Sequence, residues 1–282
     1  MKRGWNKLGF FLRKNKKSNS HSQSDIKIKL LPDCKRSQIT IFLIISIVIV
    51  LSIILIILLK SKISEQKQFS EITRINNELN DCFQQRSLDA VYLIGLQGGY
   101  VNLPSPNLKT GISSTAYGLK DNKNILLSIQ KIQDEISGFL GLTLPFCLNS
   151  GDYPELEINF KNINTNTKIL DKITTESVIS LSVSSITENK SFILDKTYQS
   201  EIPIRLKQIH ETANQIIKKH LENHGFIDLT FLTEQDFDIT FSHYDDNTLI
   251  YIITDFESSP EITELNELEE TAYSFVFVVE GK

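Results

Sequence analysis

The sequence predicts an α+β protein in which one N-terminal transmembrane helix continues into an extracytoplasmic domain with an antiparallel sheet packed against two or three helices. Three observations lead to this prediction: an unbroken apolar segment, later segments with apolar residues every three or four positions, and short segments of alternating apolar and polar residues. Groups of strands punctuated by helices are typical of the α+β class. We divide the chain into a basic cytoplasmic tail (1–38), a transmembrane helix (39–59), a membrane-proximal helix (60–90) and the extracytoplasmic domain (91–282).

The apolar segment 39–59 contains no charged residue, no Gly and no Pro. As a helix its roughly 21 residues match the hydrocarbon core of a bilayer, about 30 Å thick. A cleaved secretory signal would need a shorter apolar core, a shorter leader and a small-residue cleavage site. Because Lys60, Lys62 and Glu65 follow the segment directly, we expect a permanent membrane span, with the lipid bilayer as its partner.

The charge distribution predicts the orientation of this span. Residues 1–37 hold eleven Lys and Arg against two Asp, a net charge of +9, whereas the whole chain has a formal charge of −4. Loops rich in Lys and Arg stay in the cytoplasm. We therefore expect a single-pass protein of the cell membrane, with its N-terminus in the cytoplasm and its acidic C-terminal domain outside.

The tail mixes basic residues with apolar ones such as Trp5, Phe10 and Phe11. This composition suits the anionic inner leaflet of a membrane, and a disordered topology signal without lipid specificity explains it equally well. No folded nucleic-acid-binding module accompanies the basic residues, so we expect no nucleic-acid partner.

Two of the three cysteines, Cys82 and Cys147, follow the membrane span, whereas Cys34 precedes it. Outside the cytoplasm the pair is expected to form a disulfide, which in the chain-entropy model contributes roughly 4 kcal/mol. The alternative is two buried free thiols. The triplet that starts at Asn189 is a possible N-glycosylation site in a predicted hairpin turn.

Three segments show the apolar spacing of helices. In the first, Phe69, Ile72, Ile75, Leu79 and Phe83 form a stripe that either the domain itself or the same helix of a neighbouring chain must cover; packing against its own domain is the favoured alternative. The other two helices are expected over 125–140 and 209–221, ending near Gly141 and Gly225.

Other segments alternate in the manner of strands with one buried face. They are 156–160, 179–183 and 237–241, and a turn at 245–247 leads from the last of them to a strand over 249–253. The segment 273–279 is apolar on both faces, which indicates a central strand.

The region 95–122 fits neither period and holds five of the twelve glycines as well as Pro104 and Pro106. We predict a long loop, and such loops are often functional. Its candidate contact residues are Gln97, Gly98, Gly99, Tyr100 and Tyr117. In the alternative interpretation the glycines merely let the chain turn and pack closely.

No pattern in the sequence indicates a cofactor, a metal site or a catalytic centre. The glycines form neither a Walker loop nor a dinucleotide fingerprint, and no Gly-x-Ser-x-Gly elbow occurs. Glu257 and the glutamates at 261–270 match no calcium loop and indicate a solvated acidic surface. A tethered hydrolase, the alternative, would require His210 or His243 to lie between a carboxylate and an exposed Ser or Cys.

The junction from Lys35 to Phe42 resembles the start of archaeal class III, or prepilin-like, signal segments. The resemblance implies cleavage by a membrane peptidase between Ser37 and Gln38. Where pilin families keep a glutamate, this chain has Phe42, so it lacks the carboxylate used in filament assembly.

The outer part contains a set of distinctive motifs: Cys82, Leu93–Tyr100, Glu135–Ser137, Cys147, Ile202–Leu206 and Ala213–Asn214. As a set they resemble single-pass membrane proteins of small-genome (DPANN-type) archaea. The resemblance implies an envelope location. We expect a non-enzymatic interaction domain, pilin-like or adhesive, whose partner is a second copy or another envelope protein; a hydrolase, a sensor or a secretion-machinery subunit is the alternative.

Overall fold

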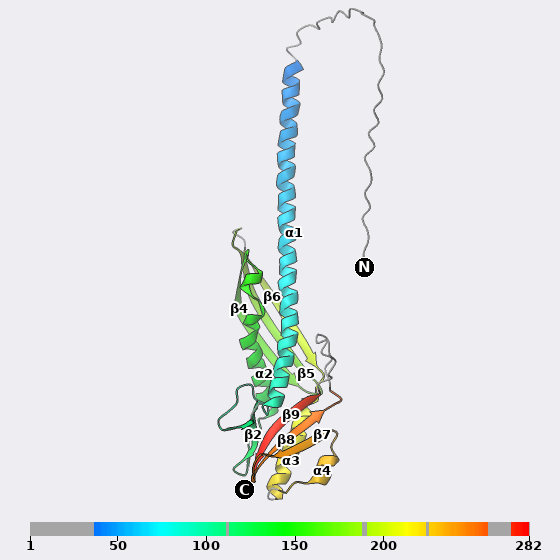
Figure 1. Ribbon diagram of the computed structural model, residues 1–282. Coiled ribbons are helices and arrows are strands. Elements are labelled where there is room, and N and C mark those ends of the chain that lie inside the picture. Colours follow the sequence, from blue (N-terminus) through cyan, green and yellow to red (C-terminus); the bar gives the residue numbers. More distant parts are fainter. Residues whose placement is uncertain (1–36, 111–112, 188–190, 224–225, 259–271, 282) are drawn as a thin grey trace, which may run out of the picture. The chain divides into compact units, whose positions relative to one another are not determined.

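The computed structural model describes residues 37–110, 113–187, 191–223, 226–258 and 272–281 (Figure 1). Most of the tail, Asn189 and the Glu-rich sequence 259–271 lie outside these residues. The chain divides into two compact units, residues 1–64 and 65–282. Each unit is described by itself.

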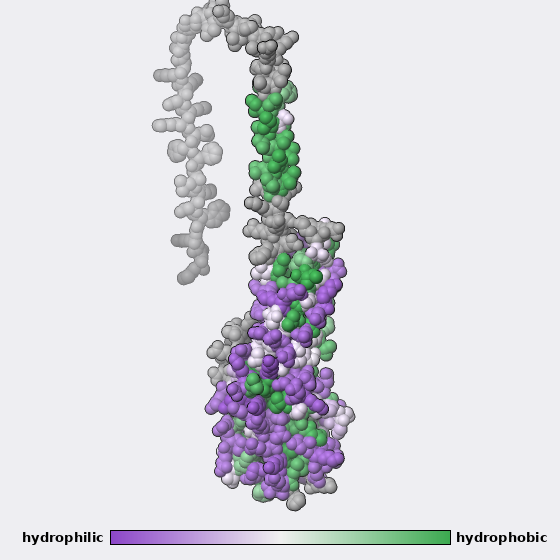
Figure 2. All heavy atoms as spheres, turned by 180° about the vertical axis from the view of Figure 1, so that it is seen from behind, coloured by the Kyte–Doolittle hydropathy of each residue, from purple (hydrophilic) through white to green (hydrophobic). Residues whose placement is uncertain are grey.

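The described part of the first unit is the beginning of helix α1 (Ser37–Leu96). Its segment Ile41–Leu58 has 18 residues, none with a buried side chain, and it is the one described segment long and apolar enough to cross a membrane. At about 1.5 Å per residue it is about 27 Å long. Ser52 donates a hydrogen bond of 2.7 Å to the carbonyl of Val48, so its hydroxyl is satisfied within the helix. Figure 2 shows the segment as a continuous hydrophobic surface. It is compatible with a single-pass membrane anchor.

In the second unit α1 is a core element. Ile75, Leu79, Phe83, Val91 and Ile94 are all fully buried, and their successive spacings of four, four, eight and three residues place them on one side of the helix. The apolar stripe predicted from the sequence is therefore covered by the domain itself over these residues. The helix also extends to Leu96, beyond the predicted end at residue 90.

One sheet of the domain consists of β4 (Leu156–Ile169), β5 (Ile173–Ser185) and β6 (Ser191–Ile202). All pairs are antiparallel, and β5 lies in the middle. The strands are much longer than the sequence suggested, because Thr and Ser replace apolar residues at inward positions such as Thr167, Thr175 and Ser177, all of which are buried.

The second sheet follows the order β1-β2-β9-β8-β7, with β3 paired to β2. Its strands are β1 (Asn107–Thr110), β2 (Ser113–Lys120), β3 (Lys123–Asn124), β7 (Asp238–His243), β8 (Thr248–Asp255) and β9 (Tyr273–Glu280). The central position predicted for 273–279 is confirmed. The predicted antiparallel sheet is confirmed for the three-stranded sheet. The second sheet was not predicted, and it is mixed because β2 and β9 pair in parallel. A parallel pair needs a long connection, and about 150 residues separate these two strands.

The remaining helices are α2 (Ile129–Thr143), α3 (Leu206–Glu222) and the short α4 (Leu229–Thr233), with 3-10 turns at Leu144–Cys147 and Ser150–Asp152. The sequence predicted the second helix from Ile125. It begins four residues later, because the Ile125 amide donates to the carbonyl of Gly118 and so continues the β2 edge.

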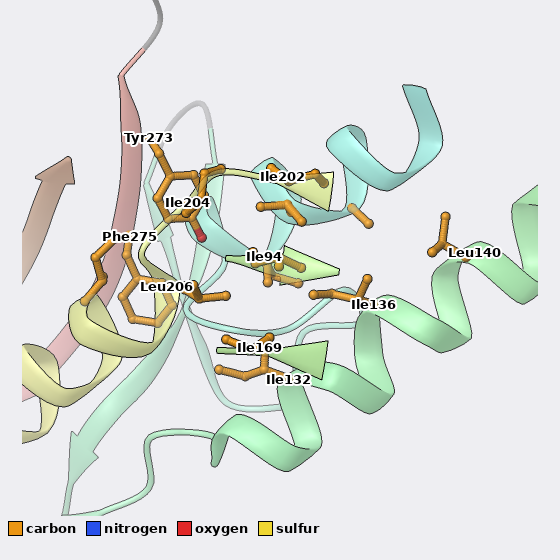
Figure 3. Packing of buried hydrophobic residues seen from close by; sticks show 14 of the residues in the cluster. Ile94, Ile132, Ile136, Leu140, Ile169, Ile202, Ile204, Leu206, Tyr273 and Phe275 are labelled. Carbon is orange, nitrogen blue, oxygen red and sulfur yellow. The ribbon is translucent and has the colours of Figure 1, made fainter. Parts of the chain in front are cut away.

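Helices and sheets meet in one hydrophobic core. Figure 3 shows Ile94 of α1 between Ile132 and Ile136 of α2 on one side and Ile204 and Tyr273 on the other, with strand residues Ile169 and Ile202 nearby. Ile94, Ile132, Ile136 and Tyr273 are fully buried. The end of α1 thus joins the two sheets through side chains rather than through strand pairing.

Two helical glycines are expected to respond oppositely to replacement by alanine. A Cβ at Gly95 would lie 2.5 Å from the carbonyl oxygen of Ser274, whereas a Cβ at Gly138 would meet nothing within 4 Å. We expect Gly95→Ala to lower the free energy of unfolding by about 1–3 kcal/mol and Gly138→Ala to raise it by about 0.5–1 kcal/mol. Urea unfolding in mild detergent, followed by circular dichroism, measures both. Equal effects would contradict the tight packing of α1 on β9.

Candidate interaction surfaces

The predicted long loop 95–122 is mostly regular structure. β1 and β2 form an antiparallel hairpin over 107–120, so the prediction of a loop is wrong there. Three of the five glycines and both prolines of the region lie before β1, and the burial pattern of β2 does not alternate between buried and exposed residues. This explains why the strands did not stand out in the sequence.

Gly98 and Gly99 form the turn that ends α1. Their φ angles are +71° and +97°, a region in which glycine is strongly favoured. The Gly99 amide donates to the carbonyl of Ile94 at 2.7 Å, the capping bond of a helix that ends in a left-handed residue. A Cβ at Gly99 would lie 3.2 Å from Ile132. Both glycines are buried. They let the chain turn and pack closely, as in the alternative interpretation of the sequence.

The side chains beside this turn are only partly exposed. Gln97, Tyr100 and Tyr117 are half-buried, and burial, together with the nearby Glu135 carboxylate, raises the pKa of Tyr100. Glu135 accepts hydrogen bonds from the amides of Val101, at 2.9 Å, and of residue 102. The contact role of Gln97, Tyr100 and Tyr117 stays a prediction, whereas Glu135 has a structural role.

Tyr117 lies on β2 beside a charged pair. The Lys120 ammonium lies 4.4 Å from the centre of the Tyr117 ring and forms an ion pair with Glu280. Burial raises the pKa of Tyr117. The tyrosine is therefore neutral at physiological pH and is held against the junction of β2 and β9.

Cys82 and Cys147 are joined by a disulfide, with their Cα atoms 5.8 Å apart. The bridge links α1 to the 3-10 turn that follows α2. The pairing agrees with the sequence prediction.

The histidines named in the hydrolase alternative have other partners. His210 lies 2.8 Å from the carbonyl of Leu127 through Nε2 and 3.2 Å from the Asn214 amide through Nδ1. His243 stacks edge-on against Phe241. Neither contact set places an imidazole between a carboxylate and a Ser or Cys. In the described part of the chain, no group of three or more His, Cys, Asp or Glu could hold a metal ion.

A third histidine, His220, pairs with a buried tyrosine. Its Nε2 lies 2.6 Å from the Tyr251 hydroxyl, and its Nδ1 has no hydrogen-bond partner among the described residues. Burial lowers the pKa of His220 and also that of His210. Both rings are therefore neutral at pH 7.

Acidification is expected to destabilise the domain through these two rings. In the unfolded chain each histidine binds a proton below about pH 6.5, whereas the folded chain does so only at lower pH. The unfolded state thus binds more protons, and the free energy of unfolding falls as the pH decreases from 7 to 5. The double variant His210→Gln/His220→Gln should show a shallower pH dependence in urea unfolding. An unchanged slope would contradict burial of the rings.

The three-stranded sheet has a broad face that none of the described elements covers. Cross-strand rows such as Asn159–Ser182–Ile193 and Asn162–Ser180–Asp195 point away from the helices. We call this surface the outward face; its central residues are Asn159, Asn162, Asn164, Val178, Ser180, Ser182, Ile193, Asp195 and Thr197. Its centre is rich in small hydroxyl and amide side chains, with Asp195 as the charged residue among those named, whereas Glu157, Lys168, Glu176 and Glu201 lie toward its ends. Its composition suits hydrogen bonding to a polar partner.

The sequence indicated the outward face only in part. Alternation over 156–160 and 179–183 predicted one buried face for each segment, but buried Thr167, Thr175 and Ser177 concealed the full length of the strands and therefore the extent of the opposite face. The available signal was Asn at every second position over 162–166.

The predicted processing and glycosylation sites have little structural context. Ser37 is the first residue of α1 and Gln38 the second, and Asn189 lies outside the described residues. Comparisons with protein-family models, curated proteins and solved structures gave no match. The functional argument therefore depends on the chain's own geometry and chemistry.

Proposed function

We propose that the protein is a membrane-anchored component of the cell envelope that displays a non-enzymatic interaction domain, of a pilin-like or adhesive kind. The observation that carries this proposal is the segment Ile41–Leu58, an uncharged helix of bilayer length with no buried side chain. Exposing that much apolar surface to water would be costly. Lipid is the solvent that removes this cost.

The orientation of the domain follows from charge and redox chemistry. Eleven Lys and Arg precede the apolar helix, which favours a cytoplasmic N-terminus. The bridge between Cys82 and Cys147 is favoured in oxidising compartments outside the cytoplasm. Two independent features thus support an extracytoplasmic domain.

An interaction role is supported by the surface of the domain. The outward face presents hydroxyl and amide groups from three long strands, and no described element covers it. In the view of Figure 2 the surface of the second unit is largely hydrophilic, with only separate hydrophobic areas. Such a surface suits a soluble, displayed domain whose partner forms polar contacts.

Protease treatment of intact cells tests the location and the orientation together. We expect an added protease to degrade the C-terminal domain, as detected by a C-terminal epitope tag, and to spare an N-terminal tag until the cells are lysed. A cytoplasmic protein of the same cells is the control for leakage. Survival of the C-terminal tag in intact cells, or recovery of the chain in the soluble fraction, would refute the proposal.

The class III resemblance adds a processing step between Ser37 and Gln38. Because α1 begins at Ser37, cleavage there would remove the basic tail and leave the apolar helix on the mature protein. Mass spectrometry of the membrane-extracted chain is expected to show Gln38 as the first residue. An intact Met1 would refute this step without affecting the anchor.

A further inference from the structure

Strand β7 ends the larger sheet and pairs only with β8 among the described residues. Its sequence, Asp238–His243, contains no Pro and no Lys. Natural proteins commonly protect sheet edges with such residues, and an edge without them accepts another strand. β7 is therefore open to strand addition.

The register shows which backbone groups of β7 are available. Tyr244 donates to the carbonyl of Thr248 at 2.9 Å, so these two residues form a hydrogen-bonded pair. Because such pairs alternate in antiparallel ladders, the backbone groups at residues 238, 240 and 242 face β8. Those of Ile239, Phe241 and His243 point to the free edge.

The same edge borders a cleft of about 320 Å³, most of whose lining residues are apolar. It is lined by Leu229, Leu232 and Thr233 of α4 and by Phe237, Asp238, Ile239 and Phe241. The Leu229 side chain is 59% exposed, although it is apolar. A strand added beside β7 would direct every second side chain over this cleft, where an apolar residue would be buried.

The charge around the cleft indicates which kind of peptide would bind there. Residues 226–258 include eight Asp and Glu and no Lys or Arg. Two cations of neighbouring elements are paired with carboxylates, Lys219 with Asp228 and Arg205 with Asp255 and Glu257. Arg205 also lies 4.9 Å from the centre of the Phe237 ring, so its charge near the cleft is already balanced. Glu234, Asp236 and Asp238 are exposed beside the cleft. The rim thus attracts positive charge.

Two other occupants carry the wrong charge. A second copy that paired through its own β7 edge would bring the same acidic segment against this one. Residues 26–30 alternate apolar residues with Lys, but they precede the apolar helix, and the proposed orientation places them on the other side of the membrane. The chain's own sequence 259–271 holds five Glu and no Lys or Arg. Like charges at an interface oppose both pairings.

We propose that the β7 edge and its cleft bind an extended peptide of another protein in which apolar residues alternate with Lys or Arg. The peptide adds a strand to the sheet through Ile239, Phe241 and His243, its apolar side chains enter the cleft, and its cations meet Glu234, Asp236 and Asp238. This mode is strand addition, in which backbone bonds provide affinity and side-chain pockets provide specificity. The inference names a partner for the proposed interaction role.

Fluorescence anisotropy with the full chain in phosphatidylcholine nanodiscs tests the inference. The probe is a labelled, capped heptapeptide of alternating lysine and valine; the controls alternate glutamate with valine and lysine with serine. We expect both control peptides to bind at least about tenfold more weakly, and binding of the lysine–valine peptide to weaken with added salt. The neutral lipid does not itself attract the cationic peptide. Both faces of the disc are accessible, so the result does not depend on which side of the cell membrane the domain occupies.

Two variants locate the site. His243→Pro removes an outward amide and should weaken binding about tenfold, whereas the matched control His243→Ala keeps the amide and should bind as the wild type does. Glu234→Lys/Asp238→Lys changes exposed side chains only and should reverse the preference, so that the glutamate–valine peptide binds better.

Three results would overturn the inference. The first is equal binding of the lysine–valine and glutamate–valine peptides. The second is lysine–valine binding that neither His243→Pro nor the charge reversal alters. The third is self-association of the chain that His243→Pro abolishes while no peptide binds, which would assign the edge to a second copy.

Discussion

Arg205→Met is expected to lower the free energy of unfolding by about 3–5 kcal/mol, because it leaves a buried carboxylate without its partner. The Asp255 side chain is fully buried, and Arg205 binds it through Nε at 3.0 Å and through a terminal nitrogen at 2.5 Å. Arg205 lies just before α3 and Asp255 at the end of β8. Urea unfolding in mild detergent, followed by circular dichroism, gives the value.

A second variant distinguishes two causes of the stability lost in Arg205→Met: the unpaired Asp255 carboxylate and the lost packing of the Arg205 side chain. The double variant Arg205→Met/Asp255→Leu removes both charges and should recover most of the stability, because an apolar pair of similar volume often replaces a buried ion pair at little cost. A double variant as unstable as Arg205→Met alone would show that the guanidinium acts through packing, for example over the Phe237 ring at 4.9 Å.

The same pair gives a pH signature. Burial by itself raises the pKa of Asp255, but hydrogen bonds from Arg205 and Ser258 outweigh it, so the net pKa is lowered. The stabilisation is therefore present above the unfolded pKa of about 3.9 and is lost as the pH falls through the folded value. The difference in stability between the wild type and Arg205→Met should narrow below about pH 4.

Removal of the disulfide is the second large effect. Cys82 and Cys147 are 65 positions apart, and opening a loop of that length is expected to cost about 4 kcal/mol in the chain-entropy model. Cys82→Ser/Cys147→Ser should therefore unfold at markedly lower urea concentration. Reductant should lower the wild type to the same midpoint and leave the variant unchanged.

Cys34→Ser is the matched control for that experiment. The residue lies in the basic tail, before α1, and its replacement should not shift the urea midpoint. If the double variant instead unfolds like the wild type, the bridge is not formed in the isolated protein.

The parts of the fold that could be predicted are those in which hydrophobicity follows one period. The charge-free segment 39–59, the buried positions Ile75, Leu79 and Phe83 of α1, and the doubly apolar β9 all meet that condition. In such segments the spacing of apolar residues by itself predicts whether one face or both faces are buried.

The rest depends on which strands become neighbours. The parallel pairing of β2 with β9 joins residues about 160 positions apart, and no local pattern encodes a contact of that length. β4 and β5 were too short in the prediction because buried Thr and Ser resemble solvent-facing ones until a partner such as Ser87 of α1, 3.0 Å from Thr175, is in place.

The same limit applies to the candidate sites. The turn at Gly98 and Gly99 stood out by composition, yet its glycines serve the packing of α1. The β7 edge did not stand out, because an edge is defined by sheet order, and sheet order was not available from periodicity. The acidic composition of residues 226–258 was the feature of this site that could be seen in the sequence.

The position of β9 constrains how the chain matures. This strand lies between β2 and β8, yet every other strand of its sheet precedes it in the order of synthesis. While the nascent polypeptide leaves the ribosome and is exported, β2 and β8 have no common neighbour to join them. Completion of the sheet must therefore await delivery of the β9 segment, and until then apolar strand surface would be open to chaperones and to quality-control proteases.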